Sequence, residues 1–142
     1  MNRRILIALC LTPAFVAGCS STEDYVDDVN QIQEDVIDAS NTIGSDVNAS
    51  KNEILKQLES AKAEADDAVS KLEDVDVPSD AEAGHEQLIK GFEHLEKLYA
   101  DVQKQVESGS GAAFDELRSE GTRIDKEIDS ALDQINDDLG LK

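Results

Sequence analysis

The feature that most constrains this chain is a spacing of apolar residues in alternating steps of three and four, which recurs in four segments. Such spacing places the apolar side chains along one stripe of an α-helix, because a helix turns once in about 3.6 residues. The first stripe comprises Tyr25, Val29, Ile32, Val36, Ala39 and Ile43. The pattern predicts an all-α protein whose helices bury these stripes against one another.

Three further stripes have the same spacing. The second comprises Ile54, Leu58, Ala61, Ala65, Ala68, Leu72 and Val75. The third comprises Ala81, His85, Leu88, Phe92, Leu95, Tyr99, Val102 and Val106. The fourth comprises Phe114, Leu117, Gly121, Ile124, Ile128, Ala131, Ile135 and Leu139. Because Trp is absent and aromatic residues make up 4% of the chain, we expect a core built mainly of Ala, Leu, Ile and Val.

The boundary between the first two helices has two interpretations. The second stripe is out of phase with the first by an insertion of four residues, which one long helix also accommodates. Gly44 favours a helix end in the left-handed conformation, and Ser50 with Glu53 matches a capping box. We therefore expect an up-and-down antiparallel bundle of four helices; the alternative is a three-helix bundle with an extended first helix.

Proline and small residues mark the later boundaries. Pro78 ends the second helix because it lacks a backbone donor. Ser79 with Glu82 matches a second capping box, and the SGSG run at 108–111 predicts a flexible turn. The expected helices span about 22–43, 50–76, 79–107 and 111–139, within one bundle domain over residues 23–140.

The N-terminal segment has the composition of a secretory signal. Arg3 and Arg4 form a basic region, and residues 5–16 are apolar apart from Thr12 and Pro13. An apolar run of about 12 residues is too short to cross a membrane as a helix, which takes about 20. We therefore expect residues 1–18 to be a cleaved signal peptide and not a transmembrane anchor.

The end of this segment, Val16-Ala17-Gly18-Cys19, resembles the bacterial lipobox, in which the cysteine thiol receives a diacylglyceryl group before cleavage. The resemblance implies cleavage between Gly18 and Cys19, a covalent lipid on Cys19, and a short tether over residues 19–22. Two or more acyl chains hold a protein stably on a bilayer. We expect no other cofactor. The alternative is an ordinary signal peptide cut nearby, which leaves a free cysteine.

The expected location is the outer side of a cell membrane, with the lipid as anchor. In Gram-negative lipoproteins an Asp after the lipidated cysteine usually signals inner-membrane retention; Ser20 stands there and permits outer-membrane sorting if the host is Gram-negative. A net charge of −19 argues against nucleic acid as a partner and against lying flat on an anionic bilayer. The expected partners are the membrane, through the lipid anchor, and an envelope protein or wall polymer.

The whole layout resembles a group of small lipoproteins of unknown function from Gram-positive, especially actinobacterial, cell envelopes. They share a lipobox, an acidic helix that starts near a Tyr, and a helix that ends Leu-x-x-Val/Leu-x-x-Pro. A helix with His-x-x-Leu, a loop of small residues and a last helix with a central Gly follow. The matching residues here are Tyr25, Leu72, Val75, Pro78, His85, Leu88 and Gly121. The resemblance implies the fold and the location but no activity.

His85 is the strongest candidate for a metal-binding residue, because it lies on the third stripe three residues after Glu82. Glu-x-x-His is part of a di-iron carboxylate site, which requires a second copy and further glutamates. No other stripe position is acidic, so a metal role for His85 and Glu82 is weaker than that of a hydrogen-bonded, partly buried histidine. The antiparallel order places His85 at the same end as Tyr25 and Leu139, and we predict a Tyr25–His85 hydrogen bond.

Gly121 occupies a stripe position, which indicates a close approach of two helices at about 1 kcal/mol of helix propensity relative to Ala; a functional kink is the alternative. The sequence contains no Ser/His/Asp order, phosphate loop or CxxC pair. We therefore expect no enzyme, but a lipid-anchored cell-envelope protein acting as an interaction or structural module. The alternative is a lipoprotein that binds a small ligand or cation and works with a membrane system.

Overall fold

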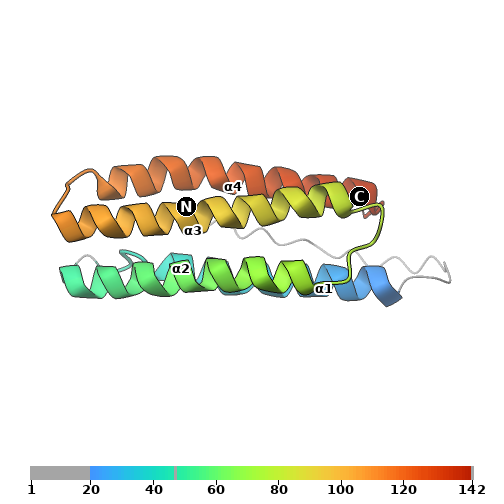
Figure 1. Ribbon diagram of the computed structural model, residues 1–142, viewed down its shortest axis with the longest axis horizontal. Coiled ribbons are helices and arrows are strands. Elements are labelled where there is room, and N and C mark those ends of the chain that lie inside the picture. The colour runs from blue at the N-terminus through green and yellow to red at the C-terminus, as the bar shows by residue number, and fades with distance from the viewer. Residues whose placement is uncertain (1–19, 47, 142) are drawn as a thin grey trace.

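The computed structural model describes residues 20–46 and 48–141, which form four helices: α1 (Ser20–Thr42), α2 (Lys51–Asp74), α3 (Glu82–Ser108) and α4 (Ala113–Asp138). Each helix runs antiparallel to the one before it, with short connections at the two ends of the bundle (Figure 1). No strand occurs within these ranges. The predicted all-α, up-and-down four-helix bundle is confirmed, and the alternative with one extended first helix is wrong.

The boundary between α1 and α2 has the predicted chemistry. Gly44 has a φ of +66°, in the left-handed region, and its N–H donates to the side-chain oxygen of Gln57 at 3.0 Å. The hydroxyl of Ser50 accepts the N–H of Glu53, and the carboxylate of Glu53 accepts the N–H of Ser50 at 2.7 Å. A left-handed residue followed by a complete capping box explains why the chain turns here and does not continue as one helix.

The second predicted capping box is wrong. α2 ends at Asp74, and Ala81, with no side-chain hydrogen bond, precedes the first residue of α3. The N–H of Ala81 donates to the carbonyl of Pro78 at 2.8 Å, so Ser79 lies within a backbone turn and not at the helix start. Ser79 and Glu82 are both exposed.

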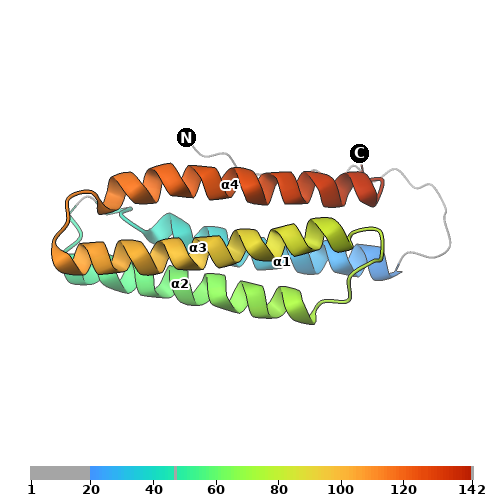
Figure 2. The same cartoon turned by 45° about the horizontal axis from the view of Figure 1, so that its top comes forward.

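The core of the bundle is centred on α3. All eight residues of its stripe are buried. Gly84, Gly91 and Leu98 are buried beside them, and a buried side this wide fits a helix that is covered by more than one neighbour. The largest fully buried side chains come from all four helices: Tyr25, Leu58, Leu72, Leu88, Ile124 and Val102. In Figure 2, α3 crosses in front of α1, with α2 below it and α4 above it.

The four sides of the bundle are not equally closed. The pairs α1–α2, α2–α3 and α3–α4 pack at short range, whereas no Cα of α1 lies within 8 Å of a Cα of α4. α1 and α4 therefore face each other across the widest side of the bundle, and α1 is held mainly by α2 and by side chains that reach α3.

Candidate functional site

The predicted cleavage and lipidation residues, Gly18 and Cys19, lie outside the described residues. α1 begins at Ser20, so residues 20–22, which were expected to form a tether, belong to the first turn of a helix. Any group attached to Cys19 is therefore one residue from the start of α1.

His85 is buried, with 5% of its surface exposed, and both of its ring nitrogens have partners. Nδ1 lies 3.0 Å from the hydroxyl oxygen of Tyr25, and Nε2 lies 3.0 Å from the carbonyl oxygen of Leu72. Because a carbonyl oxygen can only accept, Nε2 carries the proton and Nδ1 accepts the hydroxyl proton of Tyr25. The predicted Tyr25–His85 hydrogen bond is confirmed.

This set of hydrogen bonds joins three helices at one end of the bundle. Tyr25 belongs to α1, Leu72 to the last turn of α2, and His85 to the first turn of α3. The last carbonyls of a helix lack partners within the helix; that of Leu72 accepts from His85 and also from the N–H of Val75 at 3.3 Å. His85 is therefore a side-chain cap on the C-terminus of α2, and Tyr25 orients its ring.

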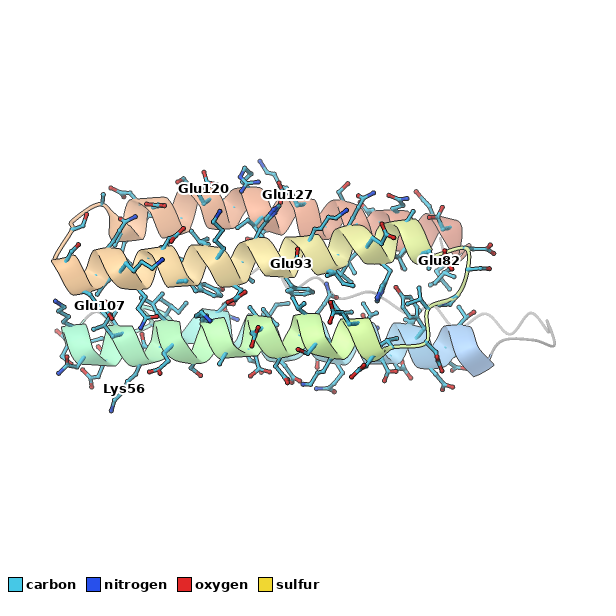
Figure 3. The ribbon with its side chains drawn as sticks, in the orientation of Figure 1. Lys56, Glu82, Glu93, Glu107, Glu120 and Glu127 are labelled. Carbon is cyan, nitrogen blue, oxygen red and sulfur yellow. The ribbon has the colours of Figure 1, made fainter. Side chains whose placement is uncertain are left out.

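The structure does not bring Glu82 and His85 together as a pair of metal ligands. Glu82 is exposed at the start of α3 (Figure 3), and both ring nitrogens of His85 are engaged inside the bundle. Among residues 20–46 and 48–141, no group of three His, Cys, Asp or Glu side chains is placed to hold a metal. Burial raises the pKa of Tyr25 to about 12, so its hydroxyl remains a donor to His85 at neutral pH.

A second tyrosine joins α1 to α3 farther along the bundle. The hydroxyl of Ser40 donates to the carbonyl of Val36 at 2.6 Å and therefore accepts the hydroxyl proton of Tyr99, also at 2.6 Å. Burial raises the pKa of Tyr99; the hydrogen bond to Ser40 opposes this shift, and the charge of Asp125 on α4 adds to it. Both tyrosine hydroxyls thus hold α1 against α3.

Two glycines that the sequence analysis did not single out set the distance between α3 and α4. A Cβ atom on Gly84 would lie 2.7 Å from Cγ1 of Ile135 and 3.1 Å from the carbonyl oxygen of Ala131. On Gly91 it would lie 2.6 Å from Cγ1 of Ile128. Carbon atoms in contact are normally about 3.5–4.0 Å apart. The detectable signal was the spacing of the two glycines, which are seven residues apart and so lie on one side of α3.

The close helix approach expected at Gly121 is wrong. A Cβ atom there would meet Cδ2 of Leu98 at 3.9 Å, an ordinary contact, and no closer atom. α4 continues through this position, and Figure 2 shows no sharp bend in it, which does not favour the alternative of a kink. The physical reason is that α1 stands away from α4 on this side of the bundle.

The charged side chains lie on the outside of the helices, as Lys56, Glu93 and Glu120 illustrate in Figure 3. Between helices, Lys71 of α2 lies 3.4 Å from Asp35 of α1, and Lys62 of α2 lies 2.9 Å from Glu96 of α3. Such exposed pairs contribute little to stability. α1 contains seven acidic residues and no Lys or Arg, and α4 contains nine acidic residues and three basic ones, so α1 and α4 are both strongly negative.

A cavity of about 410 Å³ opens between the end of α1 and the start of α4. Its lining residues are Ile43, Gly44, Asp46, Ala49, Ile54, Phe114, Leu117 and Arg118. Phe114 was expected in the core, but it is 40% exposed. The reason is that α1 ends at Thr42 and does not cover this ring, which faces the turn at Gly44.

Together these features define a small helical-bundle domain whose interior polar groups serve its own packing. In the described ranges, no buried side-chain nitrogen or oxygen lacks a hydrogen-bond partner, and no helix is both long and apolar enough to span a membrane. Comparison with protein-family models, curated proteins and solved structures gives no match. The functional interpretation therefore depends on the residues of this chain.

Proposed function

We propose that this protein is a non-catalytic interaction or structural module, anchored by a covalent lipid on Cys19 to the outer side of a bacterial cell membrane. The observation that carries the proposal is the lipobox Val16-Ala17-Gly18-Cys19 at the end of a basic and then apolar segment. The same motif underlies its resemblance to the small helical lipoproteins of Gram-positive cell envelopes.

The start of α1 supports an anchored bundle. The helix begins one residue after Cys19, so a lipid on that residue would hold the end of the bundle that contains Tyr25 and His85 close to the bilayer. A net charge of −19 would keep the remaining surface away from anionic headgroups.

The use of the buried polar groups supports a role without catalysis. His85 has both ring nitrogens engaged, and the hydroxyls of Tyr99 and Ser40 are bonded to each other. A general base or nucleophile needs a group that is free to meet a substrate. These side chains instead hold helices together.

The proposal is tested by metabolic labelling with alkyne-tagged palmitate in a bacterial host, followed by separation of membrane and soluble fractions. We expect label and membrane association in the wild type and in the control Cys10→Ala, whose cysteine lies within the signal segment. Cys19→Ala should lose the label and retain residues 1–18. Label that persists in Cys19→Ala, or a wild type released without lipid, would contradict the proposal.

A second candidate function is a lipoprotein that binds a small ligand or cation for a membrane system. The observation that favours it is the cavity of about 410 Å³ beside Phe114, because ligand sites commonly fall in this range of size. A thermal-shift panel of divalent cations and envelope lipids tests it. A Tm that stays constant across the panel would count against this function.

A further inference from the structure

We propose that the side of the bundle between α1 and α4 binds a basic amphipathic helix of a partner protein. This α1–α4 face is defined by six residues: Ile37, Ser40, Gly44, Phe114, Asp125 and Asp129. The inference rests on the proposed function, because it names the class of partner that such an interaction module would bind. It follows from the uncharged flank of α1, the width of this side of the bundle and the charges beside it.

One flank of α1 lacks charge although the helix is acidic. Steps of four, three, four and three residues align side chains along one side of a helix, and here they join Val26, Asn30, Gln33, Ile37 and Ser40. Asp35, which pairs with Lys71 of α2, lies on the opposite flank. The uncharged flank is therefore directed away from α2, toward the side occupied by α4.

No helix packs against the middle of this flank at Ile37, although Val26 is buried and Ser40 is bonded to Tyr99 of α3. In a closed bundle it would contact α4, but no Cα of α1 comes within 8 Å of a Cα of α4. Ile37 keeps 46% of its surface exposed and Phe114 keeps 40%. Phe114 lines the cavity at Gly44, together with the apolar residues Ile43, Ile54 and Leu117, and this cavity can receive an apolar side chain of a partner.

The two aspartates of the α1–α4 face favour a basic partner. Asp125 and Asp129 are one helical turn apart on α4, and within the described part of the chain neither forms an ion pair. Asp125 keeps an exposed surface, but partial desolvation raises the pKa of its carboxyl group and the charge of Asp129 raises it further. A lysine or arginine would relieve this repulsion. Arg118 lines the cavity together with Asp46, so the basic residues of the partner belong at the Asp125 end of the face.

The same charges argue against a second copy of this chain as the occupant. The full sequence has a net charge of −19 and removal of the signal segment takes away basic residues and no acidic ones, so two strongly acidic copies repel each other. A helix with an apolar stripe and flanking Lys or Arg residues satisfies both the apolar and the acidic parts of the face, in the manner of other helices that bind in grooves.

The experiment uses the full chain as the cell processes it, inserted in nanodiscs of phosphatidylcholine, with empty nanodiscs as the blank. The probe is a fluorescent synthetic helix of Leu and Lys with all Leu on one side. A peptide of the same composition with Leu scattered around the helix is its control. Binding is measured by fluorescence anisotropy, and the site is mapped by hydrogen–deuterium exchange.

We expect the amphipathic peptide to bind and to protect α1 and α4. Ile37→Ser should weaken binding about tenfold, since burial of an isoleucine side chain has roughly that effect on affinity. Leu141→Ser is the matched control, because Leu141 is also 46% exposed but follows α4. Asp125→Asn with Asp129→Asn should weaken binding more than Glu82→Gln with Glu86→Gln, which removes the same charge from α3, outside the α1–α4 face.

Equal binding of the scattered peptide, equal losses in the control variants, or protection on α2 and α3 alone would overturn the inference. Dimerisation of the free protein that Ile37→Ser abolishes would overturn it in favour of a second copy. Intact mass spectrometry of the same sample reports the lipid on Cys19. A lipidated protein that does not bind the peptide refutes the inference alone, whereas an unlipidated protein refutes the proposed anchor.

Discussion

Alanine substitutions at three helical glycines separate the effect of close helix packing from that of helix propensity. Gly84 and Gly91 lie on α3 where α4 approaches closely, whereas Gly121 lies on α4, where an added Cβ would make only an ordinary contact with Leu98. Each substitution gains about 1 kcal/mol from the higher helix propensity of Ala. The added methyl group, however, meets very different surroundings at the three positions.

The expected magnitudes follow from the atoms that each new methyl group would meet. At Gly84 these include the carbonyl oxygen of Ala131 and the backbone nitrogen of Ile135, both 3.1 Å away. Backbone atoms cannot rotate aside, so α3 and α4 must separate, and overpacking of this kind costs roughly 1–3 kcal/mol. We expect Gly84→Ala to lose up to about 2 kcal/mol of unfolding free energy after the gain in propensity.

The other two positions should behave differently. At Gly91 the close atom belongs to the half-buried side chain of Ile128, which can change rotamer, so Gly91→Ala should fall between Gly84→Ala and the wild type. At Gly121 the nearest atom lies at 3.9 Å, and Gly121→Ala should gain about 0.5–1 kcal/mol.

The assay is urea denaturation of the chain from residue 20 onward, followed by far-UV circular dichroism and analysed by linear extrapolation. Gly111→Ala is the control, because Gly111 lies in the connection before α4 with no atom within 4 Å of the added Cβ; its effect should stay within about 0.5 kcal/mol. If Gly84→Ala proved as stable as Gly121→Ala, the distance between α3 and α4 would not depend on Gly84, and the argument would fail.

Two further predictions concern the helix ends and the buried tyrosine. Ser50→Ala should cost about 0.5–2 kcal/mol of unfolding free energy because it removes the cap of α2, whereas Ser79→Ala should have little effect; equal losses in urea denaturation would restore the rejected second capping box. Tyr25→Phe should cost roughly 1–2 kcal/mol, because it leaves Nδ1 of His85 buried without a donor, and an unchanged Tm would contradict this role. The pKa of Tyr25 rises on folding from 10.0 to about 12, so its contribution to stability is complete below pH 10 and is lost as the pH rises through about 12. The Tm measured across this alkaline range should therefore fall less steeply with pH in Tyr25→Phe than in the wild type.

Much of the fold was predictable because it depends on local chemistry. The stripes on the four helices follow from the periodicity of the α-helix, and Gly44 and Ser50 set a boundary through hydrogen bonds within a few residues. The Tyr25–His85 contact was also predictable, because antiparallel order brings the start of α1 to the start of α3. The acceptor on the other side of the ring, Leu72, depends on the exact alignment of α2 with α3 and could not be predicted.

The incorrect predictions concern features that depend on how the chain connects and places its helices. The segment from Pro78 to Glu82 contains the residues of a capping box, yet the chain forms a backbone turn to Ala81 as it crosses from α2 to α3. The lipid anchor remains a prediction, because Gly18 and Cys19 lie outside the part of the chain that the structure describes.

The sequence by itself determined that the chain is helical and which side most of its helices bury, and it favoured four antiparallel helices over three, since these depend on the spacing of apolar residues and on short-range turns. Tertiary structure alone decided that α3 and α4 meet at Gly84 and Gly91 and that α1 stands away from α4 near Gly121. A stripe specifies which face of a helix avoids water. The distance to its neighbour depends on how the side chains of both helices fill the space between them, and no single segment contains that information.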